Sequence, residues 1–244
     1  MTASRFGNEP ERPPTAARGR PKARRAPGLG LAPGRTAGGA RGAPLTAARG
    51  RVLPHAVRII GGQWKRSKLP VIDSAGLRPT PSRVRETLFN WLGQDLTGRR
   101  CLDAFAGSGA LGFEAASRHA ALVVLLERDR FLAAALRQCR DRLQATAVRV
   151  ENIDALAWMK ASAPASFDLI FLDPPFGAGL TLPALERAAR LLAAGGLVYL
   201  ESGQPIDAEL LAGVGWSATR LARAGQVHYA LLERDAVGGP QGQR

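Results

Sequence analysis

The feature that most constrains the fold is an alternation of short apolar runs and helical patterns between residues 99 and 201. Nearly continuous apolar runs are typical of parallel strands that are buried on both faces. The segments between them carry apolar residues three and four positions apart, which predicts helices. We therefore expect a doubly wound α/β domain whose mostly parallel sheet is covered by helices on both faces. The predicted strands are 100–105, 122–127, 147–150, 167–173 and 197–201, with helices around 111–118, 130–143, 155–160 and 182–192, and two further strands at 215–222 and 226–232.

The positive charge of the chain is concentrated near its N-terminus. The net charge is +14, and residues 1–57 hold 11 Lys/Arg against 2 Asp/Glu. Residues 58–90 hold 7 against 2, whereas the remaining 154 residues hold 16 of each sign. A neutral body with a basic front indicates a catalytic domain beside an element that binds a polyanion.

This charge and the composition divide the chain into four parts. Residues 1–57 are rich in Gly, Pro, Ala and Arg, so we expect a disordered basic tail. The tail could tether the enzyme to RNA by counterion release, aid solubility, or reflect a start codon assigned too early, and the sequence leaves these alternatives open. The other parts are a basic extension at 58–98, the predicted α/β domain at 99–235 and a flexible C-terminus at 236–244.

The extension is predicted to be a hairpin followed by a helix. Residues 57–60 and 63–69 are expected to pair as strands across a Gly61-Gly62 turn. The helix that follows is expected to have Thr80 as its N-cap and Pro81 at its first position. Arg83 and Arg85 lie in its first turns, where cations oppose the helix dipole, which suggests a polyanion nearby. The candidate RNA-binding residues are Arg58, Trp64, Lys65, Arg66, Lys68, Arg78, Arg83 and Arg85, because they combine a stacking surface with cations.

A glycine-rich turn follows the first predicted strand of the domain. Gly107, Gly109 and Gly112 fit the pattern G-x-G-x-x-G, and Glu127 ends the next strand. This arrangement suits a dinucleotide as well as S-adenosylmethionine. Asp103 before the turn favours S-adenosylmethionine, because a carboxylate repels a pyrophosphate but attracts the donor's ammonium. The candidate cofactor-binding residues are Asp103, Phe105, Gly107, Ser108, Gly109, Glu127, Asp154 and Ala155, with Glu127 on the ribose hydroxyls, Asp154 on the adenine amine, and a helix N-cap as the other interpretation of Asp154.

The candidate catalytic residues are Asp173, Pro174, Pro175 and Phe176, which end the fourth predicted strand of the domain. Successive prolines fix φ and remove two backbone donors, leaving carbonyls that point outward. A carboxylate beside such carbonyls can accept both hydrogens of an exocyclic amine and turn its lone pair towards a sulfonium methyl. Phe176 offers a face on which a flipped-out base can stack.

The sequence disfavours several other classes of function. It has no apolar stretch of about 18 residues and no apolar leader, so we expect a cytosolic protein. It has neither a Walker loop nor a Ser–His–Asp set, and the two cysteines, Cys101 and Cys139, lack metal-ligand spacing. We therefore expect no metal cofactor.

At these motifs the chain resembles the bacterial small-subunit (16S) ribosomal RNA guanine-N2 methyltransferases. The similarity is carried by residues 58–62, 76–80, 83–90, 103–112 and 173–176. It implies a Rossmann-like class I methyltransferase with a seven-stranded sheet whose last strand is antiparallel. It also implies S-adenosylmethionine as donor, a guanine of 16S rRNA in the assembled or assembling small subunit as target, and a monomeric enzyme. Methylation of adenine N6 in DNA or RNA or of a protein glutamine, a nicotinamide-dependent oxidoreductase and a non-enzymatic binding module are the alternatives.

Overall fold

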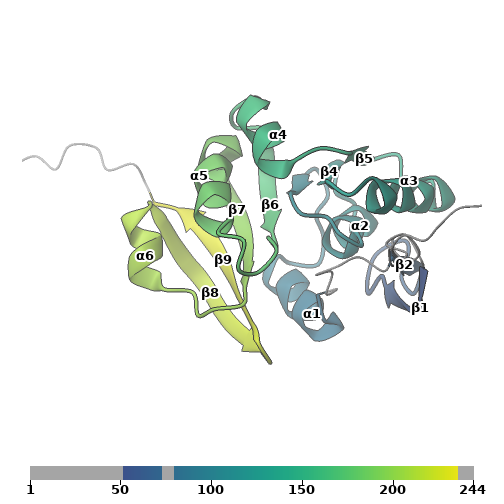
Figure 1. Ribbon diagram of the computed structural model, residues 1–244, viewed down its shortest axis with the longest axis horizontal. Helices are drawn as coiled ribbons and strands as arrows, with labels where there is room; N and C mark the ends of the chain where they lie inside the picture. The colour runs from purple at the N-terminus through teal and green to yellow at the C-terminus, as the bar shows by residue number, and fades with distance from the viewer. Residues whose placement is uncertain (1–51, 73–79, 236–244) are drawn as a thin grey trace, which may run out of the picture. The chain divides into compact units, whose positions relative to one another are not determined.

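The computed structural model describes residues 52–72 and 80–235, and its main element is a seven-stranded sheet. Its strands are β3 (Arg100–Asp103), β4 (Leu122–Leu126), β5 (Val148–Glu151), β6 (Phe167–Leu172), β7 (Leu192–Ser202), β8 (Trp216–Ala224) and β9 (Val227–Arg234). Their spatial order is β5-β4-β3-β6-β7-β9-β8. Strands β3 to β7 run parallel, and β9 is inserted antiparallel to both β7 and β8 (Figure 1). The predicted sheet with an antiparallel last strand is confirmed.

Helices cover both faces of this sheet, as the apolar strands require. The helices are α1 (Ser82–Trp91), α2 (Ala110–Ser117), α3 (Arg130–Leu143), α4 (Ala155–Ala161), α5 (Thr181–Leu191) and α6 (Ala208–Gly213). One hydrophobic cluster lies under α1, α2 and α3, and we call this side of the sheet the first face. A second cluster lies under α4, α5 and α6, on the second face. None of the helices in the described ranges is long and apolar enough to cross a membrane.

One strand and one helix differ from the prediction. Strand β7 begins at Leu192 rather than at residue 197, directly after α5. Helix α6 was not predicted; it has only six residues and is capped by Asp207, whose carboxylate accepts from the backbone N–H of Glu209 and Leu210. So short a helix leaves too few residues for a recognisable period.

The N-terminal hairpin forms a separate two-stranded sheet. Strand β1 (Val52–Arg58) pairs antiparallel with β2 (Lys68–Ile72). Residues 52–57, which we assigned to the tail, therefore belong to the hairpin, and that boundary of the prediction is wrong. Residues 59–67 make a longer connection than the expected two-residue turn, because several of their backbone N–H groups bond to α2 instead of to a partner strand.

A buried glutamate joins this connection to the methyltransferase domain. The Glu114 carboxylate accepts hydrogen bonds from the backbone N–H of Ile60 at 2.7 Å and of Gly61 at 2.8 Å. It also accepts from Arg118 Nε at 2.9 Å and lies 3.6 Å from the guanidinium of Arg85. All three charged side chains are at most 5% exposed, so the ionic network is enclosed by protein. Buried charges need such partners.

Gly62 allows the hairpin to approach α2 this closely. Its φ of +71° favours glycine, and a Cβ atom there would lie 1.8 Å from the carbonyl oxygen of Ser117. That same carbonyl accepts from Gln63 N at 2.8 Å, and the Ser117 hydroxyl accepts from Trp64 N at 3.0 Å. The Gly61-Gly62 pair therefore allows the hairpin to pack closely against α2 as well as turning the chain.

Helix α1 begins one residue later than expected. Its N-cap is Pro81, and no side chain caps it, so the prediction of Thr80 as the cap is wrong. Thr80 is instead buried, and it lies beside the carboxylates described next.

Candidate active site

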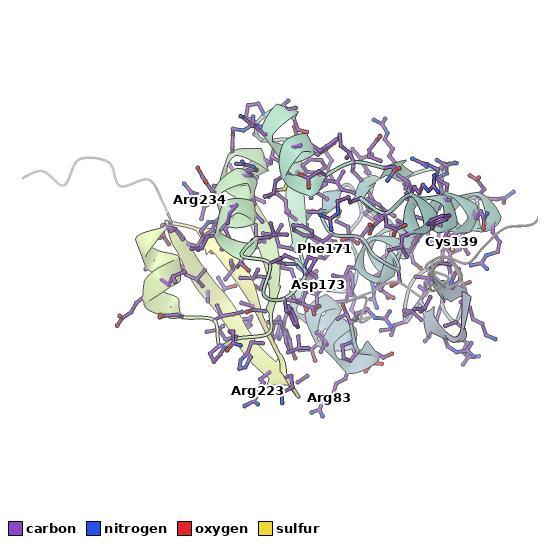
Figure 2. The ribbon with its side chains drawn as sticks, in the orientation of Figure 1. Arg83, Cys139, Phe171, Asp173, Arg223 and Arg234 are labelled. Atoms are coloured by element: carbon purple, nitrogen blue, oxygen red, sulfur yellow. The ribbon has the colours of Figure 1, made fainter. Side chains whose placement is uncertain are left out.

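Three carboxylates meet where β3, β6 and β7 end. Asp103 is the last residue of β3 and pairs with Phe171, two residues before Asp173. The register between β6 and β7 runs to the pair just before Asp173 and Glu201, so these two side chains are neighbours about 5 Å apart along the sheet. Because side chains alternate along a strand, all three carboxylates point to the first face. Figure 2 shows Asp173 directly beyond Phe171 at the end of β6.

The carboxyl groups of Asp173 and Glu201 both have pKa values above those of ordinary carboxylates. Burial raises the pKa of Asp173 well above its ordinary value, and the negative charges of Glu201 and Asp103 raise it further. Burial also raises the pKa of Glu201, which is 2% exposed and accepts a hydrogen bond from the Tyr199 hydroxyl at 2.8 Å. Hydrogen bonding from Thr80 opposes the shift of both carboxylates. The pair can therefore accept a proton where isolated carboxylates stay ionised.

Asp103 lies under the glycine-rich turn. Its Oδ2 accepts from the backbone N–H of Gly112 at 3.0 Å, and burial raises its pKa to about 7, helped by the charges of Glu127 and Glu201. A Cβ atom on Gly112 would lie 2.1 Å from a methyl of Leu125, so glycine is needed for α2 to pack on β4. A buried carboxylate with a raised pKa fits a ligand that brings a cation.

The turn itself has the backbone that its glycines predict. Gly107 and Gly109 have φ of +52° and +75°, and Gly109 is the N-cap of α2. The Glu127 carboxylate accepts from Gly107 N at 2.9 Å and from Asp129 N at 2.7 Å, and burial raises its pKa. In this structure Glu127 thus ties the turn to the end of β4.

The other candidate cofactor residues follow the neighbouring strands. Phe105 is half-buried and Ser108 is buried within the turn after β3. Asp154 follows β5 and is exposed, and its carboxylate accepts from Ala157 N at 2.9 Å as the N-cap of α4, with Ala155 buried behind it. Since β3, β4 and β5 are adjacent and parallel, these residues lie along one edge of the sheet.

The segment 173–176 forms a projecting tip at the same edge. Pro174 is buried, whereas Pro175 is exposed and Phe176 is 50% exposed. The Phe176 ring packs over Gly203, where a Cβ atom would lie 2.8 Å from the ring. An exposed aromatic ring beside a candidate catalytic carboxylate is suited to stacking against a base.

Arg85 is not the RNA contact that the sequence predicted. It is 1% exposed, and its Nη1 donates to the Arg58 carbonyl oxygen at 2.9 Å while its charge faces Glu114. Burial lowers its pKa, and Glu114 opposes that shift. The Arg85 side chain therefore joins α1 to the hairpin, whereas Arg83 is exposed.

The remaining candidate RNA-binding residues lie on the hairpin or outside the described part of the chain. Arg58, Lys65, Arg66 and Lys68 are exposed. Trp64 is half-buried against the first cluster, so only part of its ring is accessible for stacking. Arg78 lies outside the described residues.

Sequence reasoning missed Glu201 and the position of Thr80. Glu201 was placed at the end of a predicted strand, and the rule that parallel strands end at one edge could have brought it to Asp173. Thr80 could not have been found in that way, because it reaches the site from outside the sheet. Among the residues that the structure describes, no cluster of three His, Cys, Asp or Glu side chains has the arrangement of a metal site.

Comparison with known proteins adds independent evidence. The family described as Conserved hypothetical protein 95 matches residues 57–233. Ribosomal RNA small subunit methyltransferase D of Escherichia coli K12 is 45% identical over 187 residues, which are 75% of this chain and 92% of that protein. The Haemophilus influenzae protein of the same name is 40% identical over 72% of this chain and 93% of its own.

Solved structures agree with these relatives. The structure of yhhF from Escherichia coli has a TM-score of 0.64 and 42% identity, covering 74% of this chain and 99% of that one. A Haemophilus influenzae structure has a TM-score of 0.62 and 34% identity over 75% of this chain and 100% of that one. The match spans the second strand of the hairpin, the glycine-rich turn and the tip at 173–176, and the chain belongs to the Conserved hypothetical protein 95 family of methyltransferases.

Proposed function

We propose that this protein transfers a methyl group from S-adenosylmethionine to the exocyclic N2 amine of a guanine in small-subunit ribosomal RNA. The observation that carries the proposal is the position of Asp173, which lies beside Asp103 and two residues before the exposed Pro175 and Phe176. The names of the relatives support ribosomal RNA as the substrate and disfavour DNA adenine. The basic hairpin of this chain has the charge that such a substrate needs.

The residues at the strand ends fit the donor. When bound, S-adenosylmethionine supplies an electrophilic methyl on its sulfonium sulfur. Asp103, buried with a raised pKa, would hold the ammonium and become ionised beside it. The Glu127 carboxylate would reach the ribose hydroxyls and Asp154 the adenine amine, while Gly107 and Gly109 leave room for the ligand to approach the backbone.

Asp173 and its neighbours would orient the amine and accept its proton. Asp173 and the Pro174 carbonyl would accept the two amine hydrogens, so that the nitrogen lone pair faces the methyl. As the nitrogen gains the methyl it loses one proton, which the Asp173–Glu201 pair can take because its pKa values are raised. Phe176 would stack on the guanine. This mechanism depends on positioning more than on strong base catalysis.

A substitution of Asp173 tests this role. Asp173→Asn should lower methyl transfer by at least about 100-fold while binding of S-adenosylhomocysteine persists, because a neutral amide accepts the amine hydrogen more weakly than a carboxylate and cannot take up the proton that the amine loses. Asp168→Asn is the control, since Asp168 lies on the same strand but pairs with Arg100 at 3.0 Å. Full activity of Asp173→Asn would contradict the proposal, and loss of S-adenosylhomocysteine binding would assign Asp173 to the donor pocket instead.

The substrate is tested separately. Mass spectrometry of small-subunit RNA from cells lacking the gene should show one guanine without its N2 methyl, and purified protein should restore it. Comparing naked RNA, isolated small subunits and DNA as acceptors will show which one is methylated. Restoration on DNA adenine, with no change in RNA, would select the alternative activity.

The pH dependence of the reaction follows from the same pair. Because burial raises the pKa values of Asp173 and Glu201, the rate should fall as pH is lowered at values above the ordinary range of carboxylates. Glu201→Gln should shift this fall to lower pH, since it removes a negative charge beside Asp173. The measurement is kcat against pH at saturating donor, and an unshifted profile would exclude coupling between the two residues.

A further inference from the structure

A cavity of about 340 Å³ lies on the other side of the catalytic tip from Asp173. It is lined by the tip residues Pro175 and Phe176, by Leu200 and Ser202 of β7, and by Leu210 of α6. Leu200 belongs to the second cluster, and Ser202 follows it by two residues, so the cavity opens on the second face. Asp173 and Glu201 point to the first face. The tip thus separates the proposed guanine site from this cavity.

The walls of the cavity suit a flat, partly polar ring. Phe176 and Leu210 are 50% and 48% exposed, which is unusual for apolar side chains this large. Gln204 and Asp207 add hydrogen-bonding groups at the rim. The volume falls at the lower end of the range for small-molecule sites, so it fits one nucleobase better than a larger ligand.

An exposed arginine lies along the sheet from the cavity. Ser202 pairs with His228 of β9, and His228 pairs with Arg223 of β8. Paired residues point to the same face, so Arg223 lies about 10 Å from Ser202, two strand spacings away. Arg223 is exposed, and residues 216–232 contain no acidic side chain. Figure 2 shows Arg223 near the end of β8, while Asp173 follows the end of β6.

We infer that this cavity binds the base of an unpaired nucleotide next to the target guanine, with its phosphate held by Arg223. The inference rests on the proposed function, because it places the two bases on opposite sides of Phe176. A phosphate is favoured at Arg223 by charge, and the cavity itself, which has Asp207 at its rim, accepts the base. Binding a second splayed base would fix the backbone on both sides of the flipped guanine.

Kinetics with small ribosomal subunits from cells lacking the enzyme test the site. Arg223→Ala and Leu210→Ser should each raise KM for subunits about tenfold with kcat within twofold, because they remove binding rather than chemistry. Arg223→Ala should also make the slope of log binding constant against log salt concentration shallower by about one, because one phosphate contact is lost. The control is Arg220→Ala, an exposed arginine of the same strand that pairs with Leu231 of the first cluster. Unchanged KM, or an equal effect of Arg220→Ala, would overturn the inference.

A titration distinguishes base from phosphate. AMP added to isotope-labelled protein saturated with S-adenosylhomocysteine should shift the amide signals of Gly203, Gln204 and Leu210, and ribose 5-phosphate should not. Equal shifts with both ligands would indicate an anion site only, and no shift with either would exclude a nucleotide site. Failure of the wild-type enzyme to methylate any guanine would instead refute the proposed function, whatever this titration shows.

Discussion

Two arginines two residues apart on α1 lie in opposite environments. Arg83 is exposed, whereas Arg85 is 1% exposed and bonds to the Arg58 carbonyl and faces Glu114. On a helix, positions two apart point about 200° away from each other, so only one of them could lie on the solvent face. The sequence supplied the pattern but could not say which arginine was buried, because the partner, Glu114, lies on another helix.

At the same scale, Asp103 makes the stability of the fold depend on pH. Its pKa is raised to about 7 in the folded protein, so the folded state binds a proton that the unfolded state has released. The contribution of Asp103 to stability should be fullest below pH ~4, fall by on the order of 4 kcal/mol between about pH 4 and about pH 7, and level off above that. Urea unfolding at several pH values should show this decline, with Asp103→Asn giving a shallower slope.

The comparison with Asp168→Asn controls for a general effect of removing a carboxylate. The pKa of Asp168 is lowered by its hydrogen bond to Arg100, so its contribution is lost only as pH falls below the ordinary carboxylate range. That variant should keep the slope of the unmodified protein between pH 5 and pH 8. An identical slope for Asp103→Asn would show that Asp103 does not carry the effect.

At the scale of elements, the packing of the hairpin against α2 can be disrupted without substituting a charged residue. Gly62→Ala places a methyl 1.8 Å from the Ser117 carbonyl oxygen at a φ of +71°, so the hairpin must move. Gly98→Ala is the control, with a φ of +79° and no neighbour within 4 Å, and it should cost only about 1 kcal/mol of strain. Limited proteolysis should cut Gly62→Ala, and not Gly98→Ala, between residues 59 and 67. If the two variants were equally resistant to the protease, the hairpin would not depend on this close packing against α2.

Helices and strands could be predicted from the sequence where the pattern that specifies them lies within one short segment. The central strands and α3 were predicted because their apolar patterns are long, and the tip and the glycine turn because their motifs are specific. The register that makes Asp173 and Glu201 neighbours arises from contacts between distant segments. The same is true of the Glu114 network, and for that reason the hairpin boundary, the role of Thr80 and the burial of Arg85 required the structure.

At the scale of the whole molecule, the basic residues before the hairpin should affect binding rather than chemistry. Removing residues 1–51 deletes 11 Lys/Arg and 2 Asp/Glu. We expect KM for small subunits to rise at low salt, kcat to stay within twofold and the salt dependence to become shallower, because non-specific attraction to phosphates scales with charge. The measurement is methyl transfer between 50 and 200 mM salt, and equal KM values throughout would mean that the tail contributes nothing to substrate binding.

The enclosed ion network around Glu114 also constrains how this enzyme could evolve or be engineered. A piece of the chain starting at α2 would expose Glu114 and Arg118 at a surface that is buried in the intact protein, with Arg85 missing. Grafting a foreign recognition element onto the domain would leave the same charges unneutralised. We therefore expect the hairpin, α1 and the domain that begins at β3 to be inherited together rather than exchanged separately.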